Sequence, residues 1–266
     1  MSRMIDALCM SGAYPFRYLS MNTEAVASKL ASEGFKHCVM FNLTALFHRD
    51  PWWANVDFAN EDPKVDCTIH KLAVFNPDYE DKVRIREYVK MGYVGFITSP
   101  IYHGYRIMRR GVINNLIEAL NNGAIVILNL LEDLRQMHRA YSFRYRIMLG
   151  ELSDALRTLK NTAEKRGEEF RVLLSHFPYN DLANLRSLYS GDVYVDFASS
   201  QVLGAPYTHI EELAKLYGVS RLVLSTGFIM KYPKSSILKL QLSKIQDKDK
   251  EAISSVNAGR LYGIRT

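Results

Sequence analysis

Short apolar runs recur along the chain, and stretches with helical periodicity separate them. Most of the runs are continuous Val, Ile, Leu or Phe, which is typical of parallel β-strands that are buried on both faces. The eight runs cover residues 4–9, 37–42, 69–75, 94–98, 124–130, 171–176, 193–197 and 222–226. We expect each run to form a strand.

The stretches between the runs predict helices. Helical patterns cover residues 22–32, 79–91, 112–122, 149–163 and 208–217. Gly34, Gly92 and Gly123 follow the first three, and glycine accepts the left-handed conformation that commonly caps a helix. Strand and helix therefore alternate about eight times, which predicts an α/β fold: a single (β/α)8 TIM barrel formed by one domain over residues 1–266.

Two connections are too long to be simple turns. Residues 43–68 follow the second strand and hold Trp52 and Trp53. We expect these two side chains to pack in a lid or an interface rather than to stack on a ligand. Residues 131–146 follow the fifth strand and are rich in Arg, His and Tyr. In a (β/α)8 barrel the loops after the strands form the active face, so a functional site is expected there.

Composition excludes several classes of protein. The chain has 266 residues, of which 48% are hydrophobic and 23% charged, as in a folded globular protein. No apolar run approaches the roughly 20 residues that span a bilayer, and no signal peptide is evident, so we expect a cytoplasmic protein without a membrane partner. The net charge of +6 is modest for this length, and we expect no nucleic-acid partner.

Cysteine and glutamine usage adds two expectations. Cys9, Cys38 and Cys67 are widely spaced and lie in apolar surroundings, so we expect buried free thiols rather than disulfides or a zinc site. Glutamine is scarce beside many Lys, Arg and Glu, which is compatible with a heat-adapted source.

Short motifs at the predicted strand ends carry a family resemblance. They are Ile5-Asp6, Phe75-Asn76-Pro77, the segment 95–100 with Tyr102-His103-Gly104-Tyr105, the segment 132–138, Leu174-Ser175-His176, Ser225-Thr226-Gly227-Phe228, and Asn257-Ala258 with Leu261. In this order the motifs resemble those of the amidohydrolase superfamily, in its amidohydrolase-related branch of metal-dependent hydrolases and decarboxylases. The resemblance implies a TIM barrel with its site at the carboxyl ends of the strands.

The sequence departs from the family pattern where the metal should bind. The family's first-strand His-x-His reads Leu8-Cys9-Met10, and its eighth-strand Thr-Asp-Phe reads Thr226-Gly227-Phe228. Only His176 matches a ligand position, whereas a catalytic zinc ordinarily needs three protein ligands. We therefore expect a degenerate metal site, with no metal and no other cofactor.

His176 is the first catalytic candidate. At a strand end facing the barrel mouth, its imidazole could act as a general base or bind a ligand. The alternative is a histidine hydrogen-bonded in place for structural reasons. A relocated metal site built from His103, His138, His176 and Cys9 is a further alternative, which requires distant loops to converge.

Further candidates follow the fourth and fifth predicted strands. Glu132 and Asp133 are catalytic candidates, and Arg135 is a substrate-binding candidate because a guanidinium can clamp a carboxylate or phosphate with two hydrogen bonds. A structural ion network that secures the loop explains the same charges. The remaining substrate-binding candidates are His138, Tyr102 and His103.

Arginine and aromatic residues are concentrated in the same two loop regions. The basic residues are Arg106, Arg109, Arg110, Arg135, Arg139, Arg144 and Arg146, and the aromatic residues are Tyr102, Tyr105, Tyr141, Phe143 and Tyr145. Such a group could hold an anionic or aromatic ligand, or an unpaired nucleic-acid strand. A solvated surface or a homo-oligomer interface explains it too, because Arg and Tyr are common at protein interfaces.

Three functions fit these observations. The first is a barrel that binds a small anionic or aromatic molecule at its mouth without metal-dependent hydrolysis. The second is an active hydrolase or decarboxylase that works without metal or with a relocated metal. The third is a structural or regulatory subunit.

Overall fold

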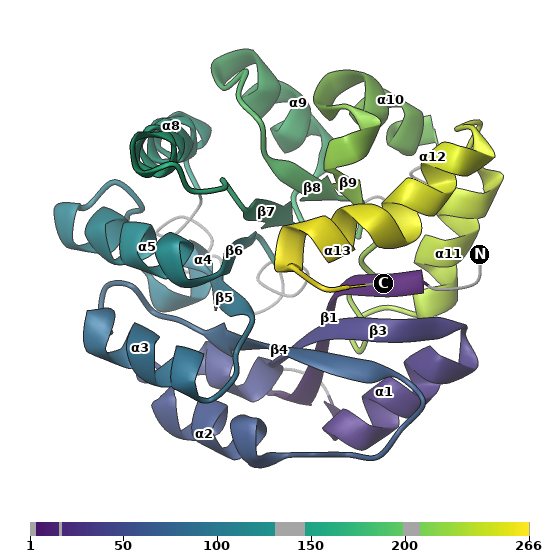
Figure 1. Ribbon diagram of the computed structural model, residues 1–266, viewed down its shortest axis with the longest axis horizontal. Helices are drawn as coiled ribbons and strands as arrows, with labels where there is room; N and C mark the ends of the chain where they lie inside the picture. The colour runs from purple at the N-terminus through teal and green to yellow at the C-terminus, as the bar shows by residue number, and fades with distance from the viewer. Residues whose placement is uncertain (1–3, 16–17, 131–146, 199–207, 266) are drawn as a thin grey trace.

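The computed structural model describes residues 4–15, 18–130, 147–198 and 208–265. Strands occupy its centre and helices surround them (Figure 1). Eight parallel strands lie in chain order: β1 (Met4–Tyr14), β3 (Phe35–Asn42), β4 (Thr68–Val74), β5 (Gly95–Thr98), β6 (Ala124–Leu128), β7 (Val172–Ser175), β8 (Tyr194–Asp196) and β9 (Leu222–Val223). The eight predicted strands are confirmed, with ends that differ by a few residues.

The sheet closes between its first and last strands. The Ala7 amide donates to the Leu224 carbonyl at 2.8 Å, and the Gly227 amide donates to the Leu8 carbonyl at 3.1 Å. These hydrogen bonds join β1 to the chain after β9, so the strands form a barrel. The predicted (β/α)8 architecture is confirmed.

Helices pack their apolar faces against the outside of the barrel. They include α1 (Thr23–Ser32), α3 (Lys82–Lys90), α5 (Arg110–Asn122), α8 (Leu149–Arg166), α9 (Tyr179–Leu188), α10 (Thr208–Tyr217) and α11 (Pro233–Leu242). In α8 the buried face includes Leu152, Leu156 and Leu159, as the sequence pattern predicted. Asn22 and Asp81 cap α1 and α3 because their side-chain oxygens accept hydrogen bonds from first-turn amides.

Several elements were missing from the sequence-based expectation, among them α9 and α11. β2 (Leu19–Met21) forms an antiparallel pair with the extended end of β1. The connection at 43–68 folds into η1 (Leu43–Phe47) and α2 (Trp52–Asn60). In α2 the buried side chains are those of Asn55 and Phe58, so an apolar stripe does not mark the helix in the sequence.

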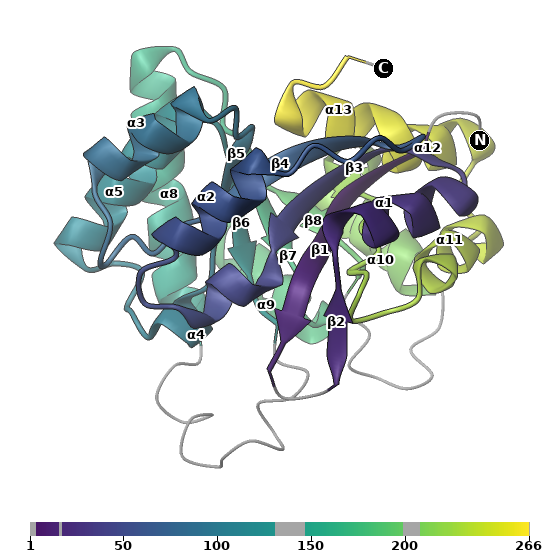
Figure 2. The same ribbon diagram turned by 90° about the horizontal axis from the view of Figure 1, so that it is seen from below.

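The last elements cover the amino-terminal end of the barrel (Figures 1 and 2). They are α12 (Asp247–Glu251), η3 (Ala252–Val256) and α13 (Asn257–Tyr262). Tyr262 Oη donates to the Ala7 carbonyl at 2.9 Å, and Asn257 Nδ2 donates to the Val219 and Leu222 carbonyls at 2.8 and 2.7 Å. A ligand site therefore belongs at the opposite end, where the parallel strands finish.

None of the helices in the described part of the chain has the length and apolar character that crossing a bilayer requires.

Candidate functional site at the barrel mouth

His176 directly follows β7 and has an unusual backbone conformation. Its φ is 61°, and it alone among the described non-glycine residues has a positive φ. The side chain is buried, and the backbone amide donates to Asp196 Oδ1 at 3.2 Å. Such a strained conformation persists only where neighbouring contacts fix it, and it is concentrated at functional sites.

A hydrogen-bonded chain sets the tautomer of His176. Ser175 Oγ donates to Asp196 Oδ2 at 2.5 Å and lies 2.8 Å from His176 Nδ1. Because the single hydroxyl proton of Ser175 points to Asp196, His176 Nδ1 must carry the proton between the ring and Ser175. The other ring nitrogen, Nε2, is then left with its lone pair.

His176 Nε2 is buried at the mouth and has no hydrogen-bond partner among the described residues. Burial, with a smaller effect of the Lys231 ammonium, lowers the pKa of His176 to about 3. The imidazole is therefore neutral at physiological pH. It can accept a proton or a hydrogen bond from a ligand.

Gly227 lies against this nitrogen. Its φ is 62°, and a Cβ added there would come within 2.7 Å of His176 Nε2. A side chain at position 227 would therefore suffer both backbone strain and a steric clash. The position that carries aspartate in the family pattern has no room for one in this arrangement.

Lys231 brings a positive charge to the same place. Its Nζ donates to the Ala198 carbonyl, and its amide donates to the Gly227 carbonyl at 3.2 Å. The Cβ of Ala198 lies 3.9 Å from the point where a Gly227 Cβ would be. The loops after β7, β8 and β9 thus bring together an uncharged imidazole and an ammonium group. Sequence reasoning missed Lys231, because no motif connects it with His176.

Asp6 forms a second buried polar group inside the barrel. Its carboxylate accepts hydrogen bonds from Thr226 Oγ1 at 2.5 Å, from the Thr226 amide at 2.9 Å and from the Leu8 amide at 3.2 Å. Burial raises the pKa of Asp6 to about 7, although these hydrogen bonds oppose the shift. Asp6 links β1 to the segment after β9, which gives the Ile5-Asp6 motif a structural role.

The predicted binding residues Tyr102 and His103 lie on α4 (Pro100–His103), in an aromatic group beside η1. The Tyr102 ring packs edge-on against Phe47 at 5.1 Å, and Phe47 packs against Tyr14 at 5.6 Å. Burial lowers the pKa of His103 to about 4, so this ring is neutral as well. A contact with a ligand stays a prediction for both residues.

The other predicted residues, Glu132, Asp133, Arg135 and His138, lie outside the described residues. Their roles stay predictions, as does the relocated metal site that would need His138. Within the described ranges, no group of three or more His, Cys, Asp or Glu side chains is arranged to hold a metal ion. Cys9, Cys38 and Cys67 are free thiols and are buried.

Two of the loop arginines form ion pairs with neighbouring elements. Arg106 pairs with Glu151 of α8, and Arg109 pairs with Asp78 in the loop after β4. Their side chains are mostly exposed. These pairs support the structural interpretation of this part of the arginine-rich region.

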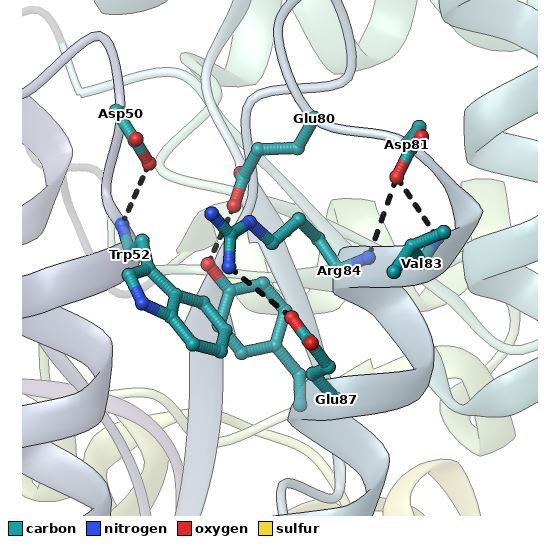
Figure 3. Close-up of polar contacts among 8 residues, drawn as sticks. Asp50, Trp52, Glu80, Asp81, Val83, Arg84 and Glu87 are labelled. Atoms are coloured by element: carbon teal, nitrogen blue, oxygen red, sulfur yellow. Dashed lines mark hydrogen bonds and ion pairs between the residues drawn. The ribbon is translucent and has the colours of Figure 1, made fainter.

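Trp52 lies on α2, outside the strands of the barrel, and faces α3 (Figure 3). The Trp52 ring packs beneath the Arg84 guanidinium, whose Cζ is 3.9 Å from the ring centroid, and lies 5.5 Å from the ring of Tyr88. Arg84 also donates to Glu87 Oε2 at 3.1 Å. Trp52 therefore joins α2 to α3, in keeping with the packing role expected for it, whereas Trp53 is 72% exposed.

Glu80 is the buried member of this cluster (Figure 3). Its Oε1 accepts a hydrogen bond from Tyr88 Oη at 2.5 Å, and its Oε2 accepts one from the Asn76 amide at 2.8 Å. Burial raises the pKa of Glu80 to about 7. The carboxyl group holds the Phe75-Asn76-Pro77 segment at the end of β4 against α3.

The closed parallel barrel, its covered amino-terminal end and its polar mouth define a TIM-barrel fold. No family model matches the sequence, and no curated protein matches it. Solved structures do match over nearly the whole chain, at identities that establish the fold alone.

Decarboxylases are among these structures. 2,6-Dihydroxybenzoate decarboxylase in complex with 2,6-dihydroxybenzoate is 12% identical, with a TM-score of 0.70 and 99% of each chain covered. Dihydroxybenzoic acid decarboxylase from a Polaromonas species, with bound manganese and the inhibitor 2-nitroresorcinol, is 12% identical, with a TM-score of 0.70 over 100% of this chain and 98% of that one. 5-Carboxyvanillate decarboxylase from Sphingomonas paucimobilis is 11% identical, with a TM-score of 0.67 and 100% of each chain covered. The resemblance seen in the sequence is confirmed at the level of fold.

Proposed function

We propose that this protein binds a small anionic aromatic molecule at the barrel mouth and does so without the metal centre of its structural neighbours. The observation that carries the proposal is the neutral, unpartnered Nε2 of His176 in a mouth that also holds the Lys231 ammonium. Together they offer a hydrogen-bond acceptor and a cation to a ligand that carries both a hydroxyl and an anionic group.

The residues at the family's ligand positions support the absence of a resident metal. Leu8 and Met10 are fully buried and offer no imidazole or carboxylate, and Gly227 has no side chain. His176 alone offers a nitrogen ligand at these positions, which is fewer than the three that a catalytic zinc site ordinarily has. A divalent ion of the kind bound by the neighbours does not fit this set, so no step is assigned to one.

The class of ligand is inferred from the chemistry of the mouth and from the neighbours. One neighbour is complexed with 2,6-dihydroxybenzoate and another with 2-nitroresorcinol, which are both hydroxylated aromatic molecules. In this chain Lys231 would attract the carboxylate, and His176 Nε2 would accept a hydrogen bond from a phenolic hydroxyl. Arg135 stays a predicted second anchor for the anion.

The Asp196–Ser175–His176 chain favours a second candidate, a metal-independent hydrolase or decarboxylase. Asp196 and Ser175 fix the proton on Nδ1 and leave Nε2 free to take a proton from a ligand hydroxyl. A product released from a bound substrate would distinguish this enzyme from a binding protein.

Calorimetry with 2,6-dihydroxybenzoate tests the proposal. We expect Lys231→Met to weaken binding about 10- to 100-fold, because a charge-assisted hydrogen bond contributes roughly 1.5–3 kcal/mol. His176→Asn should also weaken it, and asparagine tolerates the left-handed backbone at this position. Lys234→Met, which removes an exposed lysine on α11, is the matched control and should bind like the unaltered protein.

Three results would contradict the proposal: no binding by the unaltered protein, equal binding by all variants, or about one tightly held zinc or manganese per chain in elemental analysis. Chromatography of the same mixtures detects decarboxylated product. A product that the unaltered protein forms and the His176→Asn variant does not form would show that the protein is an enzyme rather than a binding protein.

A further inference from the structure

Two histidines form a pair far from the mouth, near the start of β3 and β4. His37 Nδ1 lies 3.2 Å from His70 Nε2, and the stacked rings have centroids 5.4 Å apart. The strands are parallel neighbours in which His37 pairs with Thr68 and Val39 pairs with His70. The two histidines are therefore diagonal neighbours on one face of the sheet, because residues two positions apart on a strand share a face.

The separation of the two nitrogens suits one shared metal ion. Two imidazole nitrogens bound at about 2.0–2.1 Å lie about 2.9 Å apart at right angles and about 3.4 Å apart at tetrahedral angles. The observed 3.2 Å falls between these values. A hydrogen bond between these two nitrogens uses one proton, and a metal ion would take the place of that proton after a small rotation of the rings.

We propose that His37 and His70 chelate a late first-row divalent cation at the amino-terminal ends of β3 and β4, and that Cu2+ binds most strongly among such ions. Imidazole suits copper, nickel and zinc, and copper has the highest affinity for a given set of nitrogen ligands. Water would complete the coordination, because both histidines are only partly buried and Thr68 beside them is exposed.

The neighbouring Lys71 ammonium is directed away from the pair. Lys71, which neighbours His70, directs its ammonium to carbonyls at the end of α2, including those of Phe58 at 2.7 Å and Ala59 at 3.0 Å. Successive side chains on a strand point to opposite faces, so this charge is on the other face from the pair.

This site is independent of the mouth and of the proposed function. Its two ligands come from β3 and β4 near their amino-terminal ends, whereas His176 and Lys231 follow β7 and β9 at the other end of the barrel. Metal could therefore bind at the histidine pair in a protein whose mouth holds none.

The test is a titration of tag-free protein with glycine-buffered Cu2+, in which calorimetry measures the binding. We expect one site per chain, weakened at least 10-fold in both His37→Gln and His70→Gln. Two controls should bind like the unaltered protein: His48→Gln, which removes an exposed histidine, and His176→Gln, which removes the imidazole at the mouth. Circular dichroism shows whether each variant is folded.

Electron paramagnetic resonance of the Cu2+-loaded, unaltered protein gives a second readout that needs no variant. Hyperfine coupling to two imidazole nitrogens is expected. Binding that persists in both His37→Gln and His70→Gln would overturn the proposal, as would a spectrum without imidazole nitrogen. Binding lost only in His176→Gln would place the ion at the mouth and would contradict both this proposal and the metal-free mouth.

Discussion

At the scale of single residues, His176 and Gly227 depend on each other. The left-handed backbone of His176 and the bonds of Ser175 and Asp196 aim Nε2 at a point that only a glycine leaves open. An aspartate introduced at position 227 would therefore displace the imidazole of His176 from its present position.

Gly227→Ala should lower the free energy of unfolding by roughly 2–4 kcal/mol, measured by urea denaturation. About 1–2 kcal/mol comes from the left-handed backbone, and overpacking against His176 adds a similar amount. Gly167→Ala is the matched control, because Gly167 has a φ of 68° with nothing within 4 Å of an added Cβ. Gly167→Ala should lower the free energy of unfolding by the contribution of the left-handed backbone alone.

A double-mutant cycle separates the two contributions. In a His176→Gly background the ring is absent and glycine accepts the positive φ, so the cost of Gly227→Ala should fall to that of Gly167→Ala. An undiminished cost would show that His176 is not the group that excludes a side chain from position 227.

At the scale of elements, the segment after β4 is held by a carboxyl group that titrates near neutrality. Glu80 connects the Asn76 amide to Tyr88 of α3, and its buried position raises its pKa from the ordinary 4.5 to about 7. Between these two values the folded protein binds more protons at Glu80 than the unfolded chain does. This contribution to stability is therefore present at low pH and is lost as the pH rises toward 7.

The Glu80→Gln variant tests this linkage. Unfolding free energies measured between pH 5 and pH 8 should fall with pH less steeply in the variant, and the difference between the ends of the range should be about 1–3 kcal/mol. Asp6 has a raised pKa too and contributes a fall of the same sign in both proteins. Glu168→Gln, at an exposed glutamate after α8, is the control; equal slopes in Glu80→Gln and the unaltered protein would contradict the assignment.

At the scale of the whole molecule, distant parts of the chain close the barrel. Asp6 binds Thr226 across 220 positions in the sequence, and Tyr262 binds the Ala7 carbonyl across 255. Asn257 donates hydrogen bonds to the carbonyls of Leu222, at the start of β9, and of Val219, just before it. The carboxyl-terminal helix is therefore part of the barrel's stability.

Asn257→Ala should lower the free energy of unfolding by about 2–3 kcal/mol, because it removes two hydrogen bonds that each contribute about 1 kcal/mol or more. Asn161→Ala, on the exposed face of α8, is the matched control and should change it by less than about 0.5 kcal/mol. Chemical denaturation measures both. Equal effects would show that α13 does not hold the barrel end.

The sequence by itself determined the order of strands and helices. The strand at 124–128 is a continuous apolar run, and α8 carries its apolar stripe at helical spacing. A local pattern in the sequence therefore predicts each of these two elements. The short hairpin at β2 and the helix α2 lacked such local signals and could not be predicted. The fold and the importance of His176 as a candidate also came from motifs at the strand ends.

Only the tertiary structure decided what surrounds His176. Lys231 lies far from it in sequence, and nothing local indicates that its ammonium would act on that imidazole. The same holds for Asp196, which fixes the imidazole through Ser175, and for the meeting of His37 with His70 on adjacent strands. The periodicity of apolar residues indicates which face of an element is buried. Distances between side chains on different elements are set only when the barrel closes and brings the strand ends together.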